Sequence, residues 1–243
     1  KLSKLSPLTC LTETKHRSVV LPTETEADVL VLDAHTSKDL EIFESESEGP
    51  CLFEFCNLAQ TKGGEKVLRR RMGQPWSSAA RIRATQDSIV FILEHRQHFT
   101  KLPSAYVTNR VEHYESDILP IVTHENPFEF FLDAFSLWAN HDSHYHSIVR
   151  GVQVTGKLIQ ALRFFISQAE LATPVGELVP LFREMQTLLA RPLFSRVPDH
   201  DIGGRAWKIL RLDQMFRLHE RETISRLLQL IYEIDALVSM ADV

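Results

Sequence analysis

The sequence predicts an all-α protein built from helices that pack against one another. Three observations indicate this class. Apolar residues recur at helical spacing, Ser, Thr or Asn precedes several of these segments, and Gly or Pro ends them. Between residues 93 and 214 the sequence lacks the alternating pattern of a strand-rich insertion. Of the 243 residues, 44% are hydrophobic and 24% are charged, which is typical of a folded globular protein.

Residues 1–28 show little periodicity and differ from the rest of the chain. They are rich in Thr and Ser and contain Pro7 and Pro22. We therefore expect a linker or lead-in segment here, with a short strand at residues 18–21.

A series of short helices is predicted from residue 29 to residue 95. Ser37 is expected to cap the first helix, and Gly49-Pro50 ends it because proline lacks a backbone donor. The apolar residues of this first helix are Leu40, Ile42 and Phe43. A second short apolar segment follows over residues 52–58.

The next two helices begin at hydroxyl side chains. Thr61 is expected to cap a helix that ends at residues 73–75, the sequence Gly-Gln-Pro. Ser77 or Ser78 is expected to cap a longer helix. One face of that helix is predicted to carry Ile82, Gln86, Ile89 and Leu93, with Thr85 among them.

Gly63 and Gly64 lie near the start of the helix that follows Thr61. A glycine inside a helix costs roughly 1 kcal/mol relative to alanine. Two interpretations are open: the pair lets another element approach closely, or the helix simply begins with flexible residues.

Further helices are predicted beyond residue 100. Pro103 opens one that runs to about residue 117, a long one covers residues 143–171, and another runs from Thr173-Pro174 to about residue 190. Gly151 and Gly156 are expected to bend the long helix. Residues 191–204 are predicted to form a loop, and the last long helix covers residues 214–241.

Residues 127–140, the sequence PFEFFLDAFSLWAN, are predicted to form an aromatic helix. Asn126 is a suitable cap, with proline at the first helical position and Glu129 at the third. The apolar side chains are Phe128, Phe131, Leu132 and Phe135 on one face and Phe130, Leu137 and Trp138 elsewhere. Because a helix that is apolar nearly all round is normally buried, we expect these side chains in the core and not around a ligand.

Four stretches of the chain occur in a distinctive order. LDAHTSKDLEIF, TKGGEKVLRRRMGQP and TQDSIVFIL follow one another between residues 32 and 93, and YEIDALVSMA closes the last helix. The pattern rests on Leu32, Asp33, Thr36, Leu40, Glu41, Thr61, Gly63, Gly64, Leu68, Arg69, Pro75, Ile82, Gln86 and Asp87, together with Asp235. It resembles the core, or lever, domain of MutS-family DNA mismatch-repair proteins. Between the two ends of the chain the resemblance is weak.

The resemblance implies a domain organisation. Residues 29–243 would form a MutS-like core/lever domain, with an N-terminal helical motif at 29–95 and long antiparallel lever and returning helices at 103–243. Asp33, Thr36, Leu40, Thr61, Gly63, Gly64, Leu68, Arg69, Pro75 and Asp235 would be structural motif residues. The DNA-gripping clamp that the family inserts in this domain has no counterpart here, so the resemblance is to a clamp-less MutS-related protein.

The resemblance also implies a function. In this family the core joins DNA-side modules to an ATPase domain that follows it, so we expect a fragment of a DNA-binding ATPase that ends where the ATPase domain would begin. ATP and Mg²⁺ would bind in that further domain, and a homodimer would form through it. The fragment itself is expected to hold no cofactor and to catalyse no reaction, and DNA would be a partner of the full-length protein.

The charged residues are unevenly distributed along the chain. The net charge of −5 gives no general attraction to nucleic acid. Residues 22–54 carry ten acidic side chains against Lys38, and residues 61–83 carry seven Lys or Arg against Glu65. One interpretation is that these two runs pair with each other.

The basic run contains the candidate contacts to nucleic acid or to a protein partner. These are Lys62, Lys66, Arg69, Arg70 and Arg71. Three successive arginines point in different directions around a helix, so at least one of them should be structural. An acid-paired or solvated face is the favoured interpretation.

A histidine-rich junction supports a rival function. His141, Asp142, His144 and His146 form the sequence HDSHYH, and His200-Asp201 is a second pair. Helical metal phosphohydrolases of the HD type bind metals through such pairs. Because His and Asp commonly cap helices at such junctions, we predict that no metal is bound. A third interpretation is a helical scaffold that binds partner proteins.

The cysteines and the hydropathy predict a cytoplasmic protein without a membrane partner. Cys51 and Cys56 have neither the spacing of a metal site nor that of a redox pair, and the total of three leaves no disulfide framework. No apolar run approaches the roughly 20 residues that cross a bilayer. The chain starts at Lys1 and has no signal peptide, which we interpret as a fragment of a longer protein.

Overall fold

The computed structural model describes residues 29–46, 48–140, 142–169, 173–203 and 205–243. Within these ranges the protein is all-α, as predicted, and the only strand-like pairing is an isolated bridge between Val29 and Trp76. The predicted lead-in at residues 1–28 and its strand lie outside the described residues. In the described ranges no helix is long and apolar enough to cross a membrane.

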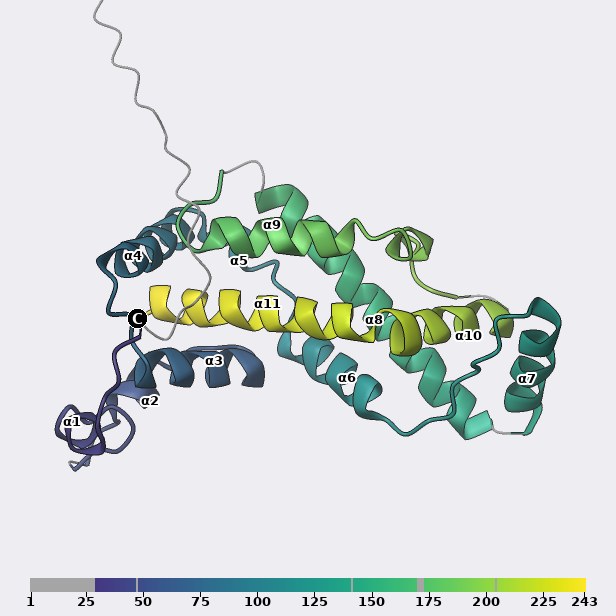
Figure 1. Cartoon of the computed structure of the whole chain (residues 1–243), viewed down its shortest axis with the longest axis horizontal. Helices are drawn as coiled ribbons and strands as arrows, with labels where there is room; N and C mark the ends of the chain where they lie inside the picture. The colour runs from purple at the N-terminus through teal and green to yellow at the C-terminus, as the bar shows by residue number, and fades with distance from the viewer. Residues whose placement is uncertain (1–28, 47, 141, 170–172, 204) are drawn as a thin grey trace, which may run out of the picture.

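The molecule is elongated (Figure 1). The elements are α1 (Ala34–Asp39), α2 (Leu52–Cys56), α3 (Lys62–Gly73), α4 (Ala79–Glu94), α5 (Arg96–Phe99), α6 (Ala105–Ser116), α7 (Pro127–Asn140), α8 (Asp142–Ala169), α9 (Leu178–Leu189), a 3₁₀ turn η3 (Phe194–Arg196), α10 (Ala206–Gln214), a π-helical segment η4 (Met215–His219) and α11 (Arg221–Ala241). Helix α11 runs along the molecule with α9 on one side and α3 and α6 on the other (Figure 1).

Helix α11 is the central element of the fold. Thirteen of its 21 residues are buried, far more than the single stripe of a helix that covers a core from one side. Contacts with α3, α4, α6 and α9 surround it along its length (Figure 1). A displacement of α11 would therefore disturb several helices at once.

Two apolar clusters hold these helices together. The larger one joins α4 to α11 and includes Phe165, Phe194 and Phe216, which are fully buried. The smaller one lies where α2 and α3 meet α11 and consists of Cys51, Phe53, Leu68 and Ala236. Burial of Leu68 agrees with its predicted structural role.

Helix α1 begins and ends earlier than predicted. Its cap is Asp33, whose carboxylate accepts a hydrogen bond from the Thr36 backbone N–H at 2.7 Å, and not Ser37. The helix ends at Asp39, and Glu41 has a left-handed backbone with φ of 47°. The apolar residues predicted to lie in this helix therefore follow it, and only Ile42 among them is buried.

Helix α4 buries only part of the predicted face: Thr85 is buried, but most of that face is exposed. Ile82 and Leu93 are exposed, whereas the buried side includes Arg81, Thr85 and Ser88. Hydrogen bonds cause this choice, because Thr85 and Ser88 bond to the segment that leads into α9. The apolar pattern alone could not show that a polar stripe would be buried.

Helix α8 is unbroken from Asp142 to Ala169, so the glycines at which bends were predicted do not interrupt it. Both glycines instead allow close packing. A Cβ at Gly151 would lie 2.0 Å from the Tyr114 ring, and one at Gly156 would lie 2.2 Å from Ile202. Side chains of other elements occupy the space that a larger residue would need.

Two other helix boundaries differ from the predictions. Helix α9 begins at Leu178 and not at Thr173, because Thr173 and Gly176 have left-handed backbones with φ of 50° and 60°. The predicted last helix, residues 214–241, is interrupted by the π-helical segment η4, which lies between α10 and α11. The predicted loop at 191–204 contains the turn η3.

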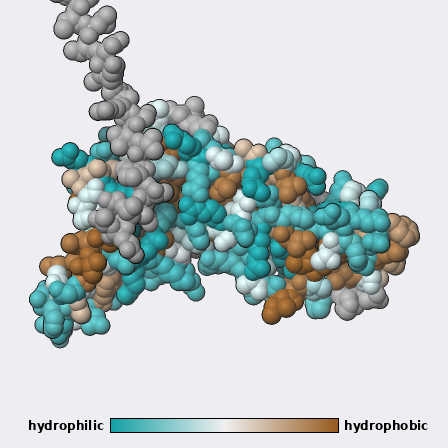
Figure 2. Space-filling model, viewed as in Figure 1, coloured by the Kyte–Doolittle hydropathy of each residue, from teal (hydrophilic) through white to brown (hydrophobic). Residues whose placement is uncertain are grey.

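Helix α7 covers residues 127–140 as predicted, but its predicted burial is largely wrong. Phe130, Ala134 and Leu137 are buried against α8 and α10. The opposite face is exposed and consists of Phe128, Phe131, Leu132, Phe135 and Trp138. Because α7 lies at one end of the molecule, it has neighbours on one side only, and apolar surface gathers at this end (Figures 1 and 2).

Candidate functional site

A buried polar joint connects the loop before α3 to α11. Thr61 caps α3 as predicted: its Oγ1 accepts from the Gly64 N–H at 2.9 Å and donates to Asp235 Oδ2 at 2.6 Å. The same carboxylate oxygen accepts from the Thr61 N–H at 2.8 Å, and Oδ1 accepts from the Gln60 N–H at 3.1 Å. Thr61 and Asp235 are each 2% exposed. A buried carboxylate is stable only with such donors, so this bond set fixes the two segments together.

The glycine pair lets α3 approach α11 at this joint. A Cβ at Gly63 would lie 2.2 Å from the Tyr232 ring, and one at Gly64 would lie 2.2 Å from Asp235 Oδ2. Of the two interpretations of the pair, close approach is therefore confirmed. Gly63, Gly64, Tyr232 and Asp235 belong to two of the four stretches that carry the MutS resemblance. Their role here is to join helices.

Ser239 provides a second point of attachment one helical turn beyond Asp235. Its hydroxyl accepts from the Leu58 N–H at 2.8 Å and donates to the Cys56 carbonyl at 2.9 Å. The loop between α2 and α3 is thus held on α11 at two positions. Nothing in the sequence indicated this contact, because a lone serine in an apolar helix has no distinctive signature.

The three successive arginines of α3 point to three different surroundings. Arg69 lies over the rings of Phe43 and Phe53, with its Cζ 4.7 and 4.6 Å from their centroids. Arg70 pairs with Glu233 of α11. Arg71, only 13% exposed, pairs with both Glu177 and Glu233 at 2.8 Å. The prediction that at least one of them is structural is confirmed.

Two arginines of the basic run pair with acids outside the acidic run. The carboxylates paired with Arg70 and Arg71 come from α11 and from the start of α9, not from residues 22–54. Lys62 and Lys66 are exposed on α3. Of the five candidate contacts to nucleic acid, these two lysines therefore remain most accessible to a partner.

Glu177 is the centre of a second buried network, and the sequence did not reveal it. Besides Arg71, its carboxylate accepts from Trp76 Nε1 at 3.1 Å and from Thr85 Oγ1 at 2.5 Å. Its backbone N–H donates to Ser88 Oγ at 2.8 Å. Burial acts to lower the pKa of Arg71, but the nearby carboxylates outweigh it and raise that pKa. The network ties α3, α4 and α9 to one another.

The remaining motif residues build the start of the described chain. Asp33 caps α1, and the hydrogen bond that its carboxylate accepts from the Thr36 N–H lowers the pKa of that carboxyl. The Pro75 carbonyl accepts from the Leu30 N–H at 2.8 Å. Leu40 is 58% exposed, so no packing role is seen for it.

A third buried network lies under the other end of α11. Arg217 of η4 forms a bidentate salt bridge with Asp213, with both N–O distances at 2.7 Å. The Tyr114 hydroxyl donates to the same carboxylate at 2.5 Å. Arg217 also donates to the Leu119 and Pro120 carbonyls. Burial and the charge of Asp213 raise the pKa of Tyr114. The i, i+4 spacing of Asp213 and Arg217 is the one sequence signal that could have indicated it.

Glu115 of α6 is a partly buried carboxyl, with Oε1 lacking a hydrogen-bond partner among the described residues. Burial raises its pKa from 4.5 to about 7, Arg221 opposes this rise and Glu112 adds to it. The folded chain thus keeps a proton there that the unfolded chain releases. The protonated Glu115 carboxyl therefore contributes to the stability of the folded chain. The contribution is complete below pH 4.5 and is lost as the pH rises through about 7.

Glu115→Gln should therefore stabilise the chain at alkaline pH. At pH about 8 we expect a gain on the order of 1 kcal/mol after allowance for solvent screening, which is a rise in Tm of about 2–4 °C. Melting curves between roughly pH 5 and 8 measure it, and the difference between the two proteins should shrink toward the acid end. Parallel Tm profiles for the two proteins would contradict this assignment.

The histidine-rich junction is only partly described. His141 lies outside the described residues, and His144 and His146 are exposed on α8. The described residues contain no group of three or more His, Cys, Asp or Glu side chains placed to hold a metal ion. At the second pair, His200-Asp201, the His200 carbonyl accepts a hydrogen bond from Gln160 Nε2. Asp201 Oδ1 lies 3.8 Å from Lys157 Nζ.

Comparisons with models of protein families, with curated proteins and with solved structures find no match for this chain. The functional conclusion therefore rests on the motif pattern and on the contacts described above. Each of the three buried networks bonds one helix to another, an arrangement suited to transmitting force between segments.

Proposed function

We propose that this chain is the helical core of a DNA-binding ATPase of the clamp-less MutS type, and that it acts as a lever. It would couple DNA-side modules to an ATPase domain that follows Val243. ATP and Mg²⁺ would bind in that further domain, which would also form a homodimer, and this chain would carry no catalytic step. DNA would reach the core as part of the full-length protein.

One observation carries the proposal. The Thr61 to Gly64 motif and Asp235, 174 positions after Thr61, form a single buried joint. They lie in two of the four stretches that carry the MutS resemblance, and a shared joint is what a common ancestral core would keep in both of them.

The geometry of α11 fits a lever. A helix of 21 residues spans roughly 31 Å and is stiff over that length. The joint holds it near its C-terminal end, and the Asp213–Arg217 network holds the segment before its N-terminal end. A displacement at one end would therefore move the other end and the helices packed along it.

Hydrogen–deuterium exchange on the full gene product tests the coupling. A non-hydrolysable ATP analogue and DNA should each change the amide exchange of α11 and α3. Ser239→Ala, which removes one attachment of the α2–α3 loop, should reduce DNA-stimulated ATP hydrolysis several-fold while basal hydrolysis persists.

Two outcomes would contradict the proposal. A full gene product that binds no nucleotide would exclude an ATPase. Nucleotide binding that leaves the exchange of α11 and α3 unchanged would exclude a lever.

A further inference from the structure

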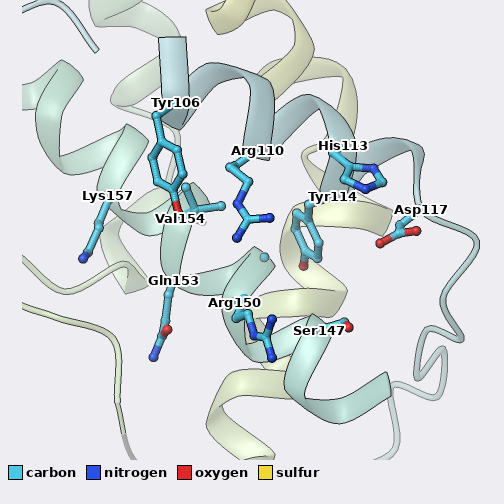
Figure 3. A pocket seen from close by; sticks show the side chains of 11 residues that line it. Tyr106, Arg110, His113, Tyr114, Asp117, Ser147, Arg150, Gln153, Val154 and Lys157 are labelled. Carbon is cyan, nitrogen blue, oxygen red and sulfur yellow. The ribbon is translucent and has the colours of Figure 1, made fainter. Parts of the chain in front are cut away.

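A basic groove of about 320 Å³ lies between α6 and α8 (Figure 3). Helix α6 supplies Tyr106 and Arg110, and α8 supplies Arg150, Gln153 and Lys157. In the close-up the side chains of both helices project toward the same hollow. The grouping of these cations is not apparent in the sequence, because they come from two separate helices.

The cations of this groove are largely uncompensated. Among the described residues no ion pair involves Arg110 or Arg150, and Lys157 lies 3.8 Å from the exposed Asp201. Asp117 is the one carboxylate among the described lining residues. This contrasts with α3, where Arg70 and Arg71 are both paired with acids. The local charge therefore favours an anionic ligand although the chain as a whole is acidic.

The spacing of the cations suits a ligand with several phosphates. Arg150 and Lys157 are seven positions apart on one face of α8, which places them about 11 Å apart along the axis. Arg110 faces them from α6. A single phosphate cannot reach all three side chains, but successive phosphates of one strand can.

An exposed aromatic ring lies beside these cations. Tyr106 is 67% exposed, and the guanidinium of Arg110 lies over its ring at 5.5 Å from the centroid. Cations that follow a backbone together with an aromatic face for a base are the two elements of single-strand recognition. An acidic peptide would use the charges but would gain little from the ring.

The floor of the groove is rigid. Gly151 lets the Tyr114 ring pack against α8, since a Cβ there would lie 2.0 Å from that ring. The Tyr114 hydroxyl is in turn fixed to Asp213 at 2.5 Å. Because α6 and α8 are held at this spacing, the cationic side chains keep their relative positions before a ligand arrives.

We propose that this groove binds a single strand of nucleic acid, with backbone phosphates on Arg110, Arg150 and Lys157 and a base against Tyr106. The binding depends on the groove alone. If the chain bound a single strand but did not respond to nucleotide, the groove proposal would stand and the lever proposal would fail.

Fluorescence anisotropy with a labelled oligothymidine of about 12 nucleotides tests the proposal on the chain itself. We expect a Kd of roughly 10⁻⁴ to 10⁻⁶ M at physiological salt. Three phosphate contacts should give a slope of log K against log salt of about −2. A duplex of the same length should compete less well, because its bases are not free to stack on Tyr106.

Paired variants locate the site. Arg110→Ala with Arg150→Ala should weaken binding about tenfold or more and bring the salt slope to a magnitude below about 1. Lys101→Ala with Arg183→Ala removes the same charge from two exposed positions outside the groove and should leave the affinity within about twofold. Tyr106→Ala should weaken binding about tenfold, whereas Tyr106→Phe, which keeps the ring, should not.

Each other result overturns the proposal. Equal losses in the two double variants would mean unspecific attraction to positive charge, and a loss confined to the control variant would place the contact outside the groove. Competition by inorganic phosphate or by polyglutamate as effective as that by unlabelled oligothymidine would assign the groove to free phosphate or to an acidic peptide.

Discussion

Gly64→Ala is expected to destabilise the chain by about 3 kcal/mol. Helix propensity alone predicts the opposite sign, because alanine is about 1 kcal/mol better than glycine inside a helix. The new Cβ would lie 2.2 Å from Asp235 Oδ2 and 2.8 Å from its Cγ, so the Asp235 side chain already occupies the space that the Cβ needs. Overpacking typically costs 1–3 kcal/mol, and displacing a hydrogen-bonded buried carboxylate adds about 1.5–3 kcal/mol.

The sign of the change makes this measurement decisive. Urea or thermal unfolding should show a Tm lowered by about 6–12 °C for a chain of this size. Gly73→Ala at the end of the same helix is the matched control, since its Cβ would meet the Phe43 ring at an ordinary 3.5 Å. That variant should be unchanged or slightly more stable. A Gly64→Ala chain as stable as its parent would show that α3 and α11 are not held together in this way.

Local patterns predicted the features that neighbouring residues determine. The cap at Thr61 and the end of α3 at Gly73 were found because a hydroxyl, a glycine and a proline act within a few positions. For Gly63 and Gly64, local patterns left two interpretations open, and close approach of another element was one of them. The family pattern included Asp235 as a motif residue, but nothing in the sequence paired it with Thr61 or with the two glycines.

Features that depend on distant partners could not be predicted. The exposed face of α7 follows from its place at the end of the molecule, and periodicity does not say how many neighbours a helix will have. The buried polar face of α4 follows from Glu177, which lies 92 positions after Thr85. The groove between α6 and α8 forms only when Arg110 and Arg150 are brought together by packing.

The second large effect is expected at the buried pair of Asp213 and Arg217. Asp213→Ala should destabilise the chain by about 3–5 kcal/mol, because it leaves the guanidinium buried without a counter-charge. The Arg217 and Asp213 side chains are only 3% and 1% exposed, so water cannot replace the lost partner. The Tyr114 hydroxyl would lose its acceptor as well, and the floor of the basic groove would loosen.

An exposed pair of the same type provides the control for this prediction. Arg226 and Glu184 also form a bidentate salt bridge, with N–O distances of 2.6 and 2.9 Å, but their side chains are 47% and 39% exposed. Glu184→Ala should therefore cost less than about 1 kcal/mol. Asp213→Leu combined with Arg217→Met removes both buried charges and should recover much of the stability lost in Asp213→Ala. Chemical unfolding of the variants measures all of these differences. Equal effects of Asp213→Ala and Glu184→Ala would mean that the Asp213–Arg217 pair is open to solvent and does not anchor the segment that leads into α11.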